Sequence, residues 1–304
     1  MTAKTKVQRQ WNLASVALTD AYTDFILSRQ AMNCTPSTLK FYRYTAGGFL
    51  LWIESQGVTD PQQVTARHVR QYLAKLISQQ RKDTTVHGNA RAIRTLLRFW
   101  HSENYIPALI KFDMPKLSKK RLPVLNAEQL KEVIKACNVR DKAIVMLLAD
   151  SGLRRGEVIA LNWNDVDMQT GLVRVKQGKG RKDRVSVIGA KVRRALLAYR
   201  RTLADRNGVL FQTDEGTRFS GNGMMMLFRR LSKKTGIHVT AHAMRRTFTI
   251  LALRAGMRPL HLQHLGGWSS LDMVDHYAQM VDEDLLQEHK AHSPVDLFAA
   301  KSKT

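Results

Sequence analysis

The chain has 304 residues, and its 49 lysines and arginines outnumber 25 aspartates and glutamates, which gives a formal net charge of +24 at pH 7. This length allows two ordinary domains with their own cores, and positive charge spread along the chain favours a long polyanion such as nucleic acid over a small acidic substrate. The two cysteines, Cys34 and Cys137, lie far apart without metal-ligand spacing, which argues against a disulfide framework and a zinc site.

Apolar stretches in the sequence are short. The longest, residues 143–149, is far too short to span a bilayer, and the first residues lack the apolar core of a signal peptide. We therefore expect a soluble cytoplasmic protein without a membrane partner. A ribosomal protein or a binder of membrane surfaces is the alternative that composition alone leaves open.

Residues 1–110 are predicted to form a helical domain. Start signals at Thr35-Pro36, Thr65 and Asp83 precede stretches of helical periodicity. The predicted helices span about 17–31, 36–55, 66–79 and 84–103.

The fourth predicted helix carries an apolar stripe and a basic stripe on different faces. The basic residues recur three or four positions apart, at His87, Arg91, Arg94, Arg98 and His101. Like charges stacked along a helix repel, and a phosphate backbone would remove that repulsion. We therefore predict DNA contacts for the first four of these residues, with a solvated helix face as the alternative.

A basic segment with two prolines follows this domain. It predicts a linker at 111–123, a second domain at 124–292 and a tail at 293–304. Lys119, Lys120 and Arg121 of the linker are further candidates for DNA contact.

The second domain is predicted to combine helices with one small hairpin. Asn126 begins a helix that runs to about residue 137, and a buried helix at 141–150 is ended by Gly152. Strands at 171–176 and 184–188 flank a basic turn at 177–182. Further helices are predicted at about 190–205, 221–234, 241–255, 259–265, around Tyr277, and at 281–290, with Met224–Met226 interpreted as core filler.

The second domain also contains residue types suited to attack on a phosphodiester. A phosphodiester under attack gains negative charge on its oxygens, and two arginines can bind those oxygens bidentately while staying protonated. A tyrosine hydroxyl, with an ordinary pKa of about 10, becomes a useful nucleophile where cations favour its ionised form. The candidate residues, in chain order, are Arg154, Glu157, Lys179, His242, Arg245, Trp268 and Tyr277.

The order and spacing of these residues resemble the tyrosine recombinase family, also called the phage integrase family. The resemblance covers about 125–277, and the first half of the chain is similar to the family's core-binding domain more loosely. It implies a mainly α protein with a small antiparallel β-sheet, in which a helical core-binding bundle and an α+β catalytic domain form a clamp on DNA.

The resemblance also implies a role for each candidate residue. Arg154 and Arg245 would hold the scissile phosphate, and Tyr277 would be the nucleophile. His242 would assist through hydrogen bonding and proton transfer, and Lys179 would protonate the departing 5′-hydroxyl. Glu157 would orient neighbouring basic groups, and Trp268 stands where many relatives have histidine. The remaining candidates would contact DNA: Arg181, Lys182 and Arg246.

The activity implied is site-specific DNA recombination through a 3′-phosphotyrosine intermediate and a Holliday junction, without metal, ATP or another cofactor. Four cleavages imply a homotetramer on paired sites in double-stranded DNA, with a monomer off DNA. The resemblance allows an accessory directionality protein, and a mobile element and the bacterial nucleoid are the expected setting.

Three other functions remain as alternatives. A type IB topoisomerase shares the tyrosine chemistry but relaxes DNA, and a non-catalytic regulator would retain the fold for DNA binding alone. Metal-dependent strand transfer needs converging carboxylates, and no compact acidic motif stands out in the sequence. The tail after Tyr277 could pack in cis or on a neighbouring protomer.

Overall fold

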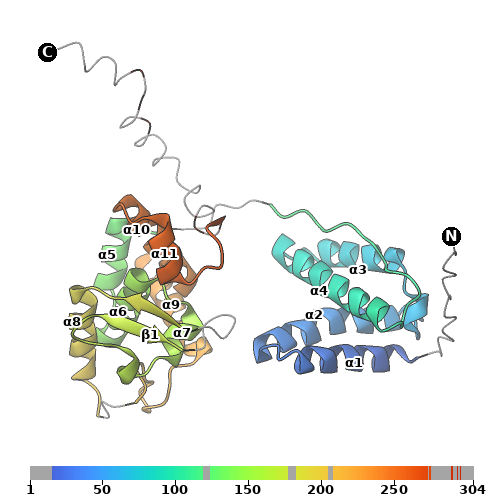
Figure 1. The fold of residues 1–304 in the computed structure, drawn as a ribbon, viewed down its shortest axis with the longest axis horizontal. Coiled ribbons are helices and arrows are strands. Elements are labelled where there is room, and N and C mark those ends of the chain that lie inside the picture. Colours follow the sequence, from blue (N-terminus) through green and yellow to red (C-terminus); the bar gives the residue numbers. More distant parts are fainter. Residues whose placement is uncertain are drawn as a thin grey trace, which may run out of the picture. The chain divides into compact units, whose positions relative to one another are not determined.

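A computed structural model describes residues 16–118, 124–176, 183–204 and 208–272, together with residues 274, 289, 293 and 295. The chain divides into two compact units, Met1–Lys120 and Arg121–Thr304. Among the described residues, the first unit is helical and the second combines helices with a two-stranded antiparallel sheet (Figure 1). The prediction of a mainly helical protein with a small antiparallel sheet is confirmed.

Four α-helices form the first unit: α1 (Leu18–Ala31), α2 (Pro36–Glu54), α3 (Ala66–Ser78) and α4 (Asp83–Ser102). They match the predicted helices to within one residue at each end, because the sequence carries strong start signals. The side chains of Thr35 and Thr65, for example, accept hydrogen bonds from backbone N–H groups in the first turns of α2 and α3. A short 3₁₀ helix, Pro61–Gln63, precedes α3.

Helix α4 contacts α1, α2 and α3, as α2 contacts the other three helices of the first unit. Its apolar face is fully buried at Ile93, Leu97 and Trp100. The indole N–H of Trp100 donates to the backbone oxygen of Ala21 at 3.1 Å, so the polar atom of this core residue has a partner.

Residues 111–118, which open the predicted linker, lie along α4. Arg94 donates to the backbone oxygen of Phe112 at 3.1 Å, and its guanidinium carbon lies 5.4 Å from the centre of that ring. Ser118 Oγ donates to Asp83 Oδ2 at 2.7 Å. This part of the segment is therefore fixed to the first unit by side-chain contacts, and Lys119, Lys120 and Arg121 lie outside the described residues.

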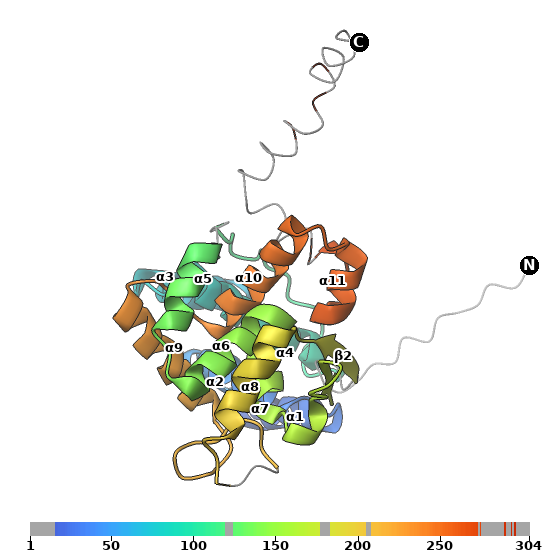
Figure 2. The same ribbon diagram turned by 90° about the vertical axis from the view of Figure 1, so that its left-hand side faces the viewer.

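The second unit is built around α6 (Val139–Ser151), which contacts α5 (Ala127–Lys135), α7 (Arg155–Ala160), α8 (Ala190–Arg200) and α10 (Ala241–Arg254). Figure 2 shows α5, α7, α8 and α10 around α6 within this unit. Helix α6 is buried along most of its length, which confirms the prediction of a buried helix there. Asn138 begins it by accepting the backbone N–H of Asp141 at 2.8 Å.

The hairpin consists of β1 (Leu172–Val175) and β2 (Arg184–Val187), paired antiparallel so that Val175 lies opposite Arg184. Both strands were predicted, and the turn between them at 177–182 lies outside the described residues. The unit is completed by α9 (Gly221–Thr235), α11 (Pro259–Gly266) and a 3₁₀ helix, Trp163–Asp165. The predicted helices around Tyr277 and at 281–290 also lie outside the described residues.

Two predictions for the second unit were wrong in detail, and one helix was missed. Helix α8 ends at Arg200, about five residues before its predicted end. Of the methionine cluster, Met224 is buried, whereas Met225 and Met226 are each 53% exposed, so only one of the three fills the core. Helix α7 was not predicted, because its six residues are too few to show helical periodicity.

Two general features of the described residues bear on the class of protein. None of their helices combines the length and the apolar character needed to cross a membrane. They also contain no group of three or more His, Cys, Asp or Glu side chains arranged to hold a metal ion.

Gly152, which ends α6, offers a test of the packing in this unit. It has a φ of 61°, and a Cβ at this position would collide with the ring of Phe248. Gly236 ends α9 with a φ of 71°, and nothing lies within 4 Å of the place where its Cβ would be. Both glycines therefore avoid left-handed strain, but only Gly152 also avoids a steric clash.

We expect Gly236→Ala to lower the free energy of unfolding by about 1–2 kcal/mol, since only the left-handed strain applies. Gly152→Ala should lower the free energy of unfolding by about 1–3 kcal/mol more than Gly236→Ala does, because the added Cβ overpacks against Phe248. Urea unfolding of both variants measures the difference. Equal losses in the two variants would contradict the packing between α6 and α10.

Candidate active site

Arg154 is positioned by the turn between α6 and α7. Gly152 ends α6 in a left-handed conformation, and Arg154 then becomes the residue that precedes α7. Glu157, in the first turn of α7, accepts the backbone N–H of Arg154 at 2.6 Å through Oε2. It also accepts the Arg154 side chain at 2.8 Å through Oε1. One carboxylate thus holds both the main chain and the side chain of Arg154.

The carboxylate of Glu157 also binds a second arginine. Arg184, the first residue of β2, donates to Glu157 Oε2 at 2.7 Å. Burial raises the pKa of Glu157, but hydrogen bonds from Arg184 and Arg154 and the positive charge of Arg184 lower the pKa below its usual value on balance. Glu157 is therefore ionised at neutral pH.

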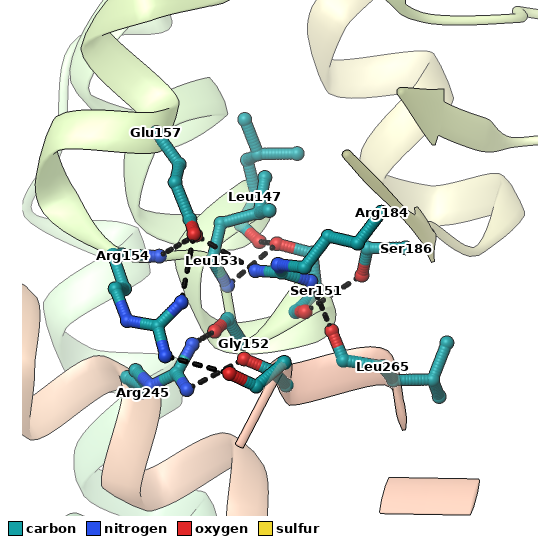
Figure 3. A network of polar contacts seen from close by, with 12 residues as sticks. Leu147, Ser151, Gly152, Leu153, Arg154, Glu157, Arg184, Ser186, Arg245 and Leu265 are labelled. Atoms are coloured by element: carbon teal, nitrogen blue, oxygen red, sulfur yellow. Dashed lines mark hydrogen bonds and ion pairs between the residues drawn. The ribbon is translucent and has the colours of Figure 1, made fainter. Parts of the chain in front are cut away.

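Three arginines converge on the C-terminal end of α11. Its consecutive backbone oxygens at Leu265, Gly266 and Gly267 accept hydrogen bonds from Arg184, Arg245 and Arg154, respectively. Two of these distances are 2.6 Å, for Arg245, and 2.7 Å, for Arg154. Figure 3 shows the three guanidinium groups turned toward this end of the helix, with Glu157 above them. The last carbonyls of a helix carry partial negative charge, so they stabilise the cluster of cations.

Arg245 lies deepest of the three, with 3% of its surface exposed. It comes from α10 and also donates to the backbone oxygen of Gly152. Its guanidinium carbon is 4.2 Å from the centre of the Trp268 ring, and Trp268 is itself 8% exposed. Trp268 therefore packs directly on one of the predicted phosphate-binding residues.

His242 lies one helical turn before Arg245 on α10 and is exposed to solvent. Desolvation by the neighbouring protein lowers the pKa of His242, and the positive charges of Arg246 and Arg245 lower that pKa further. The imidazole is therefore neutral at neutral pH and can accept a proton. A cavity of ≈ 380 Å³ adjoins it, with Arg155 and Arg229 among the lining residues.

The structure thus brings Arg154, Glu157, Arg245 and Trp268 into one network of contacts, with His242 on the same helix as Arg245. Tyr277 and Lys179, predicted as nucleophile and general acid, lie outside the described residues. The candidates for DNA contact at Arg181 and Lys182 lie outside them as well.

Other candidates for DNA contact differ in how far they are open to solvent. Arg246 is only 4% exposed, so a DNA phosphate could reach it only if the surrounding side chains moved. On α4, His87 Nδ1 lies 3.1 Å from the backbone oxygen of Pro115, and Arg94 is bound to Phe112. The remaining two predicted contacts on that helix, Arg91 and Arg98, are exposed.

Arg184 is the member of this network that the sequence did not single out. It is the first residue of a predicted strand, and its partner Glu157 lies 27 positions earlier, on a different element. No helix or strand spacing connects two such positions. The only sequence signal is an arginine in an otherwise short, partly apolar strand, which is too weak to predict a buried cation.

Comparison with known proteins identifies relatives along most of the chain. A model of the phage integrase family matches residues 123–284. Tyrosine recombinase XerA from Thermococcus onnurineus is 30% identical over 257 residues, covering 83% of this chain and 87% of that protein. Tyrosine recombinase XerC from Oceanobacillus iheyensis is 26% identical over 280 residues, covering 86% of this chain and 92% of that protein.

Solved structures give the same picture of the fold. A crystal structure of XerA recombinase covers 91% of this chain and 99% of its own, with a TM-score of 0.53 and 25% sequence identity. A dimer of lambda integrase residues 75–356 bound to a COC′ core site covers 86% of this chain and 95% of its own, with a TM-score of 0.72 and 17% identity. At that identity the second likeness concerns the fold alone.

The environment of His242 leads to a prediction about its titration. In the DNA-free protein we expect the imidazole to titrate below its ordinary value of 6.5, so the neutral form persists above that lowered pKa and is lost as pH falls through it. NMR titration of the ring measures this, with His242→Gln assigning the resonance. Arg246→Gln should raise the pKa of His242, because it removes a nearby positive charge. A pKa at or above 6.5 in the unmodified protein would contradict the electrostatics of the site.

Proposed function

Because the chain belongs to the phage integrase family and is a tyrosine-type site-specific recombinase, we propose that it cuts and rejoins double-stranded DNA at paired sites through a 3′-phosphotyrosine. The observation that carries this proposal is the arginine cluster at the end of α11. Within the described residues, the three guanidinium groups are accompanied by one carboxylate, Glu157, which pairs with Arg154 and Arg184, so these groups together carry net positive charge.

Arg154 and Arg245 are suited to hold the scissile phosphate. Their positions are fixed by backbone oxygens and by Glu157, so little rearrangement is needed when a phosphate binds. The side chain of Arg154 stays 29% exposed, which leaves one side of it accessible. Arginine binds phosphate oxygens bidentately and keeps its proton, so it can stabilise the charge that develops as the phosphorus is attacked.

The proposed reaction then runs in two reversible steps. The Tyr277 oxygen attacks phosphorus, and the bond to the 5′-oxygen breaks as a 3′-phosphotyrosine forms. Neutral His242 is suited to accept the tyrosine proton, and Lys179 gives a proton to the departing 5′-oxygen. A 5′-hydroxyl of the partner strand reverses these steps and releases Tyr277, and no ATP is needed because the phosphotyrosine conserves the phosphodiester energy.

Exchange of both strands through a Holliday junction requires four cleavages, one by each of four tyrosines. We therefore propose a homotetramer on paired DNA sites and a monomer off DNA, with an accessory protein able to set direction. Helical domain 1–110 would bind DNA beside the catalytic domain at 124–292, with 111–123 as linker. The DNA in the lambda integrase structure supports DNA as the partner.

Tyr277→Phe is expected to abolish covalent attachment to a suicide DNA substrate, because phenylalanine has no nucleophilic oxygen. Denaturing gel electrophoresis of end-labelled DNA measures the adduct. Tyr44→Phe is the control, since Tyr44 is 75% exposed and lies in the first unit, and it should form adduct at the normal rate. An adduct of normal yield with Tyr277→Phe would refute the nucleophile.

Arg154→Ala is expected to slow cleavage at saturating DNA by about 10²–10³-fold, the loss typical of one removed transition-state donor, and to retain most of the DNA affinity. Single-turnover adduct formation and gel shifts measure the two quantities, with the exposed Arg194→Ala as control. Normal cleavage by Arg154→Ala would refute the phosphate role. A two-site plasmid separates recombination from relaxation: relaxed but never recombined plasmid would favour a topoisomerase.

A further inference from the structure

We propose that Arg184 is a positioning residue that sets the geometry and charge of Arg154 for phosphate binding, an inference that rests on the proposed function. Its side chain is 12% exposed, so it contributes through the residues it holds. It lies between two other elements of the site. One guanidinium nitrogen binds Glu157 of α7 at 2.7 Å, and the other binds the backbone oxygen of Leu265 at the end of α11 (Figure 3).

The first effect of Arg184 concerns charge. Glu157 Oε2 is shared between the Arg184 side chain and the Arg154 backbone N–H, and only Oε1 accepts the Arg154 side chain. If Arg184 were absent, the buried carboxylate would have a single guanidinium partner and would compete with a phosphate for it. Because Arg184 neutralises part of the negative charge of Glu157, the guanidinium of Arg154 keeps more of its positive charge for binding the phosphate.

The second effect concerns the end of α11, which is shaped to receive this side chain. Gly267 has a φ of 64°, and a Cβ on it would lie 2.6 Å from Cδ and 2.7 Å from Nε of Arg184. A glycine therefore permits the close approach of backbone and arginine. Because the oxygen of Gly267 accepts from Arg154 and that of Gly266 from Arg245, the turn held by Arg184 is the one that orients both phosphate-binding candidates.

The third effect reaches the hairpin. Arg184 lies opposite Val175 at the end of the sheet where the predicted turn with Lys179 begins. The contacts of Arg184 with Glu157 and Leu265 therefore anchor the strand that leaves this turn to the Arg154 site. The Nε of Arg184 is buried and has no hydrogen-bond partner within the described part of the chain.

The decisive variant is Arg184→Met, which keeps the length of the side chain and removes its charge. At saturating DNA we expect single-turnover adduct formation to fall about 10–100-fold, as for other residues that orient a reacting group, with the DNA concentration at half-saturation unchanged. Adding Glu157→Gln should restore part of the rate, because the unbalanced carboxylate is then gone. Arg184→Lys keeps the positive charge. Its rate of single-turnover adduct formation should therefore lie between the rates of Arg184→Met and of the unmodified protein.

Arg193→Met is the matched control for folding. Within the described part of the chain, Arg193 also has a buried Nε without a hydrogen-bond partner, and its hydrogen bonds go to the backbone oxygens of Met168 and Gln169, which are not part of the arginine cluster. The Arg193→Met variant should have a lower free energy of unfolding, but the folded variant should form adduct at the normal rate. Normal adduct formation by folded Arg184→Met would overturn the proposal, as would a loss confined to DNA affinity or a loss that Glu157→Gln does not relieve.

A crystal structure of Arg184→Met gives a readout that needs no activity. We expect the Arg154 side chain to leave the oxygen of Gly267 and turn fully onto Glu157, and unchanged positions of Arg154 and Gly267 would overturn the positioning role. Failure of the proposed function would differ, because the unmodified protein itself would then form no adduct that depends on Tyr277. The crystal structure would still decide the role of Arg184 in that case.

Discussion

The C-terminal end of α11 holds together three guanidinium groups that would otherwise repel one another. Its consecutive backbone oxygens each accept a hydrogen bond from a different arginine, namely Arg184, Arg245 and Arg154. These oxygens carry the partial negative charge of a helix end, and Glu157 adds one full charge between two of the three cations. The fold therefore fixes the positive charge before any phosphate arrives, which is the condition under which electrostatic stabilisation of a transition state is strongest.

This convergence depends on glycines that let three helices approach closely. Gly152 directs its oxygen to Arg245 while the ring of Phe248 occupies the space that a Cβ would need. Gly266 is covered in the same way by the ring of Trp268, which also packs on Arg245. The close contacts of Phe248 with Gly152 and of Trp268 with Gly266 therefore lie beside the hydrogen bonds that Arg245 donates to the oxygens of the same two glycines.

Local patterns in the sequence were sufficient for the helices of the first unit, for α6 and for the hairpin, because capping residues and apolar periodicity act within a few positions. The site is built differently. Arg184 and Glu157 are 27 positions apart on different elements, and the partner of Arg94 is a backbone oxygen at Phe112, beyond the end of α4. Helix and strand spacing cannot predict contacts between such distant positions. The candidate residues were therefore predicted from the family resemblance, whereas the contacts that hold them are visible only in the fold.

Arg245 connects phosphate binding with proton transfer, because it is a candidate phosphate ligand and lies one helical turn from His242 on α10. Desolvation is the main cause of the lowered pKa of His242, and the positive charges of Arg246 and Arg245 lower that pKa further, so the imidazole is neutral in the free protein. A phosphodiester bound to Arg154 and Arg245 would bring negative charge and offset that effect, so the pKa of His242 would rise. Under the proposed mechanism, the imidazole therefore becomes a stronger base when the scissile phosphate is in place, which is when Tyr277 has to lose its proton.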